Sequence, residues 1–147
     1  MCPYRPPQSL QHIDTWLFDL DNTLYPPTCN LQQQMAAQAQ QLLCDVLGVS
    51  AVEAHELIMT YMHEYGTALH GLSKHHGITP ELFFKCIHDV DYSVVKADPA
   101  LNVALGELTG RKFIFTSGTA DHAERVLGRL GCATQFDAIF DIVATDY

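Results

Sequence analysis

The sequence has few basic residues and no long apolar run. Eight Lys and Arg stand against 17 Asp and Glu, which gives a formal net charge of −9. Without a basic surplus the chain cannot neutralise many phosphates, and this argues against general binding to nucleic acid or to anionic membranes. No stretch approaches the roughly 18 consecutive apolar residues of a membrane span. A small anionic substrate stays compatible with this composition, because a bound cation can reverse the local field inside one pocket.

The sequence also lacks closely spaced cysteines, and its first ten residues are not typical of a signal peptide. Its five cysteines are odd in number and widely spaced, with no CxxC pair, and they predict reduced thiols in a cytoplasmic protein. The first ten residues, MCPYRPPQSL, contain three prolines and no apolar run of signal-peptide length. We expect residues 1–10 to be a loose leader.

The stretch WLFDLDNTLYP, residues 16–26, places two acids at the end of a predicted strand. The apolar residues before Asp19 indicate a buried strand over residues 13–18, and a second acid, Asp21, follows two positions later. Asn22 and Thr23 favour a turn, so the carboxylates are expected at the carboxyl edge of an open α/β sheet, where ligands of such sheets bind. A solvated loop with helix-capping acids is the alternative for this pattern alone.

The rest of the chain alternates between helical and strand patterns. Helices are predicted over residues 30–47, 50–66, 67–77 and 79–90, with caps at Asn30, Ser50 and Thr79 and no strand between 27 and 96. A helix over 100–108, a buried strand over 112–116, a helix over 120–131 and a strand over 139–143 follow. The inward residues of the 120–131 helix are predicted to be Ala123, Val126, Leu127 and Leu130. This order predicts an α/β protein with parallel strands and right-handed crossovers.

Two carboxylates at one strand end can divide the work of phosphate-ester cleavage. One carboxylate can attack and form a covalent intermediate. The other, if the like charge nearby raises its pKa, can protonate the leaving alcohol and later deprotonate the hydrolytic water. Two acids facing a dianionic phosphate require a hard divalent cation, so we expect Mg²⁺.

A second polar turn, Thr116-Ser117-Gly118, follows the strand at 112–116. It offers a hydroxyl and free backbone N–H groups at the mouth of the next helix, which suits an anion. Such a turn is weak evidence by itself. Two polar turns at strand ends on either side of a helical insertion favour a phosphate site over the loop interpretation.

Several segments resemble a known superfamily. FDLDNTL (18–24) and FIFTSG (113–118) resemble motifs I and II of the haloacid dehalogenase-like superfamily, and the helical insertion lies where that superfamily has its C1 cap. The segments YGTALHGL (65–72), HDVDYSVVKADPAL (88–101) and GRKFIFTSGTADHAERVLGRLG (110–131) with FDAIFDI (136–142) resemble its pyrimidine 5′-nucleotidase branch. The resemblance implies a Rossmann-like core from 11–26 and 98–147, with a helical C1 cap from 27–97.

The resemblance also implies roles for individual residues. Asp19 would be the nucleophile that becomes an aspartyl-phosphate, and Asp21 the general acid and base. Thr116 would bind phosphate, where we also expect Ser117 and Thr23, and Mg²⁺ would be held by the Asp19 carboxylate and the Asp21 backbone carbonyl. The second acid favours phosphate transfer to water over halide displacement.

The implied function is a Mg²⁺-dependent phosphomonoester hydrolase, with a pyrimidine nucleoside 5′-monophosphate as the expected substrate. A phosphatase of another small metabolite, such as a sugar phosphate, is an alternative within the enzyme class. A non-catalytic binding or regulatory domain that kept the fold is an alternative outside it.

Two departures from the superfamily pattern stand out. Ser117 occupies a position where relatives usually have Asn, and the motif III lysine and motif IV acids do not appear before Tyr147. Lys96 and Lys112 do not fill the lysine's place. Without the motif IV strand, the strand at 13–18 is expected to expose an unpaired edge. A fragment of a longer protein, a partner chain or second copy over that edge, and a degenerate relative all fit, and we expect the 147 residues alone to be inactive or impaired.

The eight histidines form no HExxH motif. We expect them on the surface of the cap or between its helices, with His70 as the one that could face the substrate. The aromatic pairs Phe83-Phe84 and Tyr61/Tyr65 are expected in the cap core, with base stacking as the alternative.

Overall fold

The computed structural model describes residue 10 and residues 12–144, so most of the expected leader, and Cys2, lie outside the described residues. Three strands form one sheet in the order β1-β2-β3: β1 (Thr15–Phe18), β2 (Arg111–Phe115) and β3 (Ala138–Phe140). Both strand pairs are parallel. The predicted α/β class with parallel strands is confirmed, and the carboxyl ends of the strands meet at one edge of the sheet.

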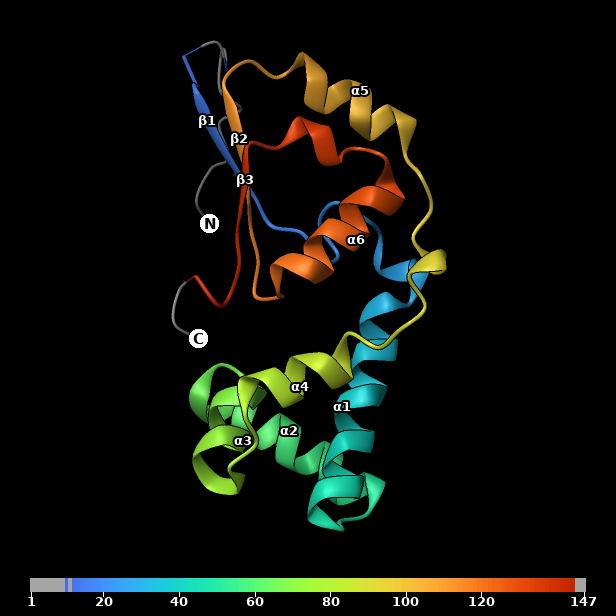
Figure 1. Ribbon diagram of the computed structural model, residues 1–147, viewed down its shortest axis with the longest axis vertical. Coiled ribbons are helices and arrows are strands. Elements are labelled where there is room, and N and C mark those ends of the chain that lie inside the picture. Colours follow the sequence, from blue (N-terminus) through green and yellow to red (C-terminus); the bar gives the residue numbers. More distant parts are fainter. Residues whose placement is uncertain (1–9, 11, 145–147) are drawn as a thin grey trace, which may run out of the picture.

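Two helices cover one face of this sheet: α5 (Pro99–Glu107) and α6 (Ala120–Leu130), as Figure 1 shows. The prediction for the inward face of α6 is confirmed, because all four of its named apolar residues are buried. Ile114 in β2 is also fully buried. This side of the sheet therefore forms the core of the strand-containing part.

No helix of the described residues covers the opposite face. Leu17 of β1 is 66% exposed, Phe115 of β2 is 54% exposed and Phe140 of β3 is 43% exposed. The predictions of buried strands at 13–18 and 112–116 are therefore wrong for this face. Along each strand alternate side chains point to opposite faces, so only every second residue packs under the helices. Among the described strands β1 pairs only with β2, which leaves its other edge unpaired.

The last strand is shorter than the 139–143 predicted from its apolar residues. It ends at Phe140, because Asp141 turns the chain: its carboxylate accepts the backbone N–H groups of Ala120 (2.9 Å) and Ala144 (3.0 Å). This tie also fixes the beginning of α6 against the end of β3.

Four helices follow β1 and precede α5 in the sequence: α1 (Leu31–Leu47), α2 (Ala51–Tyr65), α3 (Ala68–His76) and α4 (Pro80–Ile87). They lie below the sheet in Figure 1. Residues 27–96 contain no strand, as predicted. Three short 3₁₀ helices also occur: η1 (Pro27–Cys29) and η2 (Tyr92–Val94) in this segment, and η3 (Ala133–Gln135) between α6 and β3. The division of the chain into a core and a cap domain stays a prediction.

Local capping explains most of these helix boundaries. Ser50 and Glu53 form the predicted capping box, and the Thr79 hydroxyl accepts the N–H of Leu82. Asn30 precedes α1 as predicted, but its side chain makes no capping hydrogen bond, because its backbone is left-handed with φ 64°. Capping by side chains thus holds for α2 and α4 but not for α1.

A glycine lets α2 and α3 approach closely. A Cβ atom at Gly71 would overlap the ring of Tyr61 on α2. Tyr61 is buried, and Phe83 and Phe84 of α4 are buried beside each other in an edge-to-face contact. Tyr65 is only partly buried and stacks on His70. Of the aromatic residues expected in the cap core, three are therefore buried.

The described residues also show the state of the cysteines and the hydropathy of the helices. Its cysteines Cys29, Cys44, Cys86 and Cys132 are free. None of its helices is long and apolar enough to cross a membrane.

Candidate active site

The turn after β1 holds Asp19 and Asp21 in different surroundings. Asn22 adopts a left-handed backbone with φ 58°, which Asn tolerates better than most residues. The turn brings Thr23 back toward Asp19, and its hydroxyl donates to Asp19 Oδ2 over 2.7 Å. Asp19 is exposed, and no described residue binds its Oδ1 atom. One oxygen of Asp19 is thus held while the other is open to solvent.

Two aromatic side chains donate hydrogen bonds to the carboxylate of Asp21. His122 Nε2 donates to Asp21 Oδ1 over 2.8 Å, and the hydroxyl of Tyr25 donates to the same oxygen over 2.5 Å. The side chain of His122 is fully buried, and that of Asp21 is 15% exposed. Both hydrogen bonds end on Oδ1, so Oδ2 is the oxygen left for a ligand.

The pKa of Asp21 lies below its usual value. Burial by itself raises this pKa, but the hydrogen bond from His122, the charge of the His122 ring and the hydrogen bond from Tyr25 together outweigh burial. Burial and the same hydrogen bond to Asp21 raise the pKa of Tyr25. The condition for the acid role, an upward shift caused by a neighbouring acid, is therefore not met in this structure, because the contacts with His122 and Tyr25, which the sequence pattern did not predict, lower the pKa.

The second turn, Thr116-Ser117-Gly118, lies where β2 ends. The Thr116 hydroxyl is buried and accepts the N–H of Gly118 over 3.0 Å, whereas Ser117 is exposed. A Cβ atom at Gly118 would come within 2.9 Å of Cδ2 of His122. Glycine at this position therefore gives His122 the room to reach Asp21.

Two histidines of this site are buried, and one of them, His122, lies on α6, outside the helical part where the histidines were expected. His122 is 0% exposed and His88 is 7% exposed, and their rings stack with centroids 4.4 Å apart. The hydroxyl of Tyr92 lies 3.0 Å from Nδ1 of His122, and burial raises the pKa of Tyr92 to about 12. Burial, together with the charge of His122, lowers the pKa of His88 to about 4. The only sequence signal for these residues was their place in segments that carried the resemblance.

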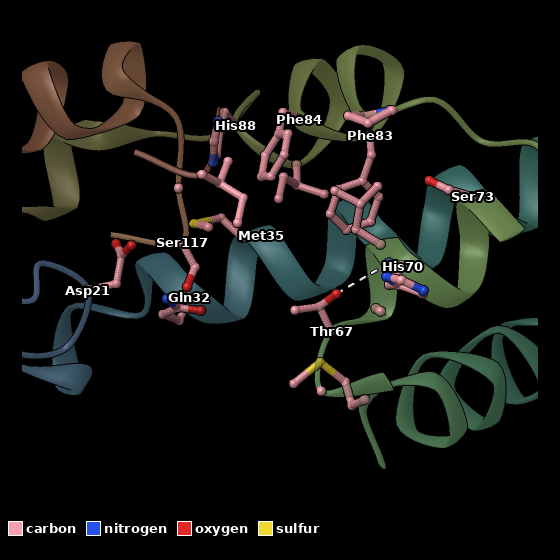
Figure 2. A pocket seen from close by; sticks show the side chains of 18 of the residues that line it. Asp21, Gln32, Met35, Thr67, His70, Ser73, Phe83, Phe84, His88 and Ser117 are labelled. Atoms are coloured by element: carbon pink, nitrogen blue, oxygen red, sulfur yellow. Dashed lines mark hydrogen bonds between the residues drawn. The ribbon is translucent and has the colours of Figure 1, made fainter. Parts of the chain in front are cut away.

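A cavity of about 830 Å³ runs from Asp21 into the helical part. Figure 2 shows Ser117 and His88 toward the Asp21 end and Phe83, His70 and Ser73 toward the other end. His70, the predicted substrate-facing histidine, is thus one of the lining residues. Much of the lining is apolar or aromatic, including Met35, Leu69, Phe83, Phe84 and Ile87.

The other predicted site residues lie outside this lining. Asp19, Thr23 and Thr116 are not among the residues that line the cavity, although Thr116 and Asp19 are sequence neighbours of residues at its Asp21 end. Asp21 and the Ser117-Gly118 turn are therefore the part of the predicted phosphate site that opens directly into the cavity.

Hard oxygen atoms are present for a cation, but few of them come from side chains. The described residues contain no group of three or more His, Cys, Asp or Glu that could hold a metal ion. The Asp21 carbonyl accepts no backbone hydrogen bond from a described residue, and Asp19 keeps one carboxylate oxygen open. This donor set fits Mg²⁺, which usually takes one or two protein oxygens and completes its shell with water and substrate phosphate.

The fold and site define an α/β protein with a helical part and polar turns at the ends of adjacent parallel strands. No protein-family model matches the chain. The chain is 32% identical over 136 residues to Phosphate metabolism protein 8 of Saccharomyces cerevisiae. The match covers 84% of this chain and 42% of the yeast protein, so the chain spans less than half the length of this relative.

Proposed function

We propose that this chain carries the nucleophile half of a Mg²⁺-dependent phosphomonoester hydrolase that works through an aspartyl-phosphate. The observation that supports it best is the meeting of Asp21 and the Ser117-Gly118 turn at one end of a large cavity. Similarity to a yeast protein named for phosphate metabolism supports the same chemistry. The resemblance of FDLDNTL and FIFTSG to the haloacid dehalogenase-like superfamily supports the assignment of roles.

In the proposed reaction one carboxylate oxygen of Asp19 attacks phosphorus while the other is left for the cation, and the bond from phosphorus to the ester oxygen breaks. Asp21 gives its proton to the departing alkoxide. As a carboxylate, Asp21 then takes a proton from water as that water attacks the acyl-phosphate, which releases inorganic phosphate and restores Asp19. Mg²⁺ held by Asp19 and the Asp21 carbonyl would neutralise phosphate charge.

The lowered pKa of Asp21 fits the second of these steps directly, because the carboxylate is the form that accepts a proton. The first step needs the protonated form. A dianionic phosphate bound beside Asp21 raises the pKa of its carboxyl group, since like charges disfavour the charged form. Substrate binding therefore supplies the condition for the acid role.

The cavity favours a nucleoside monophosphate over a sugar phosphate. Its volume of about 830 Å³ suits a ligand the size of a nucleotide, and its aromatic and aliphatic walls suit a flat base rather than a polyhydroxylated chain. Gln32, Ser73 and His70 offer polar groups among these walls for the edge of a base. The pyrimidine preference rests on the resemblance alone.

The test is phosphate release from uridine 5′-monophosphate and p-nitrophenyl phosphate, with Mg²⁺ and with EDTA. It should be run on the 147-residue chain and on the complete product of its gene. We expect Asp19→Asn and EDTA each to reduce release to background. Asp14→Asn is the matched control, because it makes the same charge change at an exposed position before β1 and should retain activity. Full turnover by Asp19→Asn would refute the nucleophile assignment.

Asp19 and Thr116 do not line the cavity, and this favours one second candidate, a binding or regulatory domain without catalysis. Calorimetry distinguishes the two. Uridine 5′-monophosphate that binds to the complete gene product with Mg²⁺ present, without any release of phosphate, would favour this second candidate.

A further inference from the structure

The end of the cavity away from Asp21 carries a cation, Lys74. His70, Ser73 and Lys74 stand at positions i, i+3 and i+4 of α3, so they share one face of this helix, and all three line the cavity. Figure 2 shows Ser73 and His70 at the end opposite to Asp21. Among the described residues that line the cavity, Lys74 is the only Lys or Arg, and Asp21 is the only Asp or Glu. The cavity therefore has an acid at one end and a cation at the other.

The ammonium group of Lys74 is accessible to a ligand. Lys74 is exposed, and no described residue forms an ion pair or a hydrogen bond with its Nζ atom. Its Nζ lies over the ring of Tyr65, 5.1 Å from the ring centroid. The same ring stacks on His70 with centroids 5.2 Å apart, and its hydroxyl lies 2.7 Å from Nε2 of His75. These contacts position Lys74 and leave the hydrogen bonds of its ammonium for a ligand.

Lys74 and its neighbour Ser73 differ in what they can bind. The Ser73 hydroxyl donates its proton to the carbonyl of Ile78 over 2.7 Å, so its oxygen can only accept a further hydrogen bond. A lysine ammonium has three donors and no acceptor. Lys74 is thus the charged donor at this end of the cavity, and its partner must be an acceptor atom.

A pyrimidine nucleotide presents one particular group to this end of the cavity. In the proposed function the phosphate lies at the Asp21 end, so the sugar and the base extend toward α3. Ring atom C4 of a pyrimidine lies opposite N1, which carries the sugar, so the group on C4 points away from the phosphate. This group is a carbonyl oxygen in uracil and an amino group in cytosine. Of the two, the carbonyl oxygen is the one that accepts a hydrogen bond from an ammonium.

We propose that Lys74 is a specificity-determining residue that donates a hydrogen bond to the C4 carbonyl oxygen of a uracil base. The site then prefers uridine 5′-monophosphate to cytidine 5′-monophosphate, because the amino group of cytosine faces the ammonium donor to donor. This inference rests on the proposed function and adds to it the residue that distinguishes two pyrimidine nucleotides.

The measurement is kcat/KM for uridine 5′-monophosphate divided by kcat/KM for cytidine 5′-monophosphate, with the complete gene product and Mg²⁺. Phosphate is common to both nucleotides, and so is the ribose, so the ratio reports on the base. Lys74→Met removes the ammonium and keeps a side chain of similar length, whereas Lys74→Arg keeps the positive charge and the donors. The matched control is Lys85→Met, at an exposed position of α4 that does not line the cavity.

We expect the wild type to favour uridine 5′-monophosphate about tenfold, which is the effect of one hydrogen bond from a charged donor. Lys74→Met should abolish or reverse this preference, because the Ser73 oxygen remains as an acceptor for the cytosine amino group. Lys74→Arg should keep the ratio within about threefold of the wild type, since it retains a charged donor. Lys85→Met should leave it unchanged.

Three outcomes of this measurement would overturn the inference. One is a wild type without a preference for the uracil nucleotide, and another is a wild-type ratio in Lys74→Met. The third is an equal fall of kcat/KM for both nucleotides in Lys74→Met, since that result assigns Lys74 to the phosphate or the sugar. Lys74 is exposed, so neither of its substitutions removes a side chain from the core.

Calorimetry keeps the inference testable without turnover. Each nucleotide is titrated with Mg²⁺ into Asp19→Asn of the complete gene product, with and without Lys74→Met. Tighter binding of uridine 5′-monophosphate that depends on Lys74, without phosphate release by the wild type, supports the inference while the proposed function fails. Phosphate release from both nucleotides at a ratio that Lys74→Met does not change supports the proposed function and overturns the inference. No binding of either nucleotide also overturns it.

Discussion

The buried ring of His88 makes the stability of this protein depend on pH. Burial, with the charge of His122, lowers the pKa of His88 to about 4, against 6.5 for an unperturbed histidine. Between these two values the unfolded chain binds a proton at this position and the folded chain does not. The contribution of the neutral His88 ring to the free energy of unfolding is therefore fully present above about pH 6.5, and it is lost as the pH falls toward about 4.

The two pKa values give the size of this effect. Between about pH 7.5 and about pH 5, protonation of the unfolded chain at His88 lowers the free energy of unfolding by about 2 kcal/mol. Asp21 does not contribute in this range, because its pKa is lowered from 3.8 and its stabilising effect is lost only at lower pH.

The assay is urea unfolding followed by circular dichroism at the two pH values, for the wild type and for His88→Gln. The glutamine does not titrate, so the variant should lose about 2 kcal/mol less than the wild type between the two conditions. Only the difference between pH values is compared, so the cost of the substitution itself cancels. His63→Gln, at an exposed position, should behave as the wild type.

Equal losses in the wild type and His88→Gln would refute the reasoning from burial. An NMR titration of the His88 ring protons gives the pKa directly and does not depend on how well the variant folds. A midpoint near 6.5 in that titration would contradict the same reasoning, because it would mean that the ring exchanges protons as freely as in the unfolded chain.

Two glycines allow matched tests of close packing. Gly118→Ala places a methyl group about 2.9 Å from Cδ2 of the buried His122 ring, so we expect a loss of about 1–3 kcal/mol in urea unfolding together with a lower kcat. Gly71→Ala overlaps the ring of Tyr61, and we expect a similar loss of stability with a separation of α2 from α3. The control for both is Gly128→Ala in α6, where nothing lies within 4 Å of the added atom. It should be neutral or stabilising, and an equal loss there would refute the packing argument.

Local patterns predicted most of the secondary structure. The capping box at Ser50, the cap at Thr79 and the apolar spacing of α6 depend on residues close together in the chain, and the structure confirms them. The burial of β1 was predicted wrongly because it depends on what covers the sheet. A run such as Trp16 to Phe18 has the same apolar character whether one face is covered or two.

The surroundings of the candidate site were harder to predict for the same reason. His122 and Asp21 are 101 residues apart in the sequence, and His88 and Thr119 are 31 apart. No periodicity or motif spacing connects such pairs. The acids and the polar turns could be located from strand ends, but the histidines that alter the pKa of Asp21 are brought there only by the packing of α6 and α4.

Among the described strands β1 pairs with one neighbour only, and this has a consequence for local unfolding. A strand with one neighbour has fewer backbone hydrogen bonds to break, so its amide protons are expected to exchange with solvent sooner than those of β2. The turn after β1 does not depend on the sheet alone, since Thr23, Tyr25 and His122 all bind its two acids. At the other end of the strand, the indole N–H of Trp16 donates to the Thr109 carbonyl over 2.8 Å. These side-chain hydrogen bonds therefore hold Asp19 and Asp21 in place although β1 pairs with one strand only.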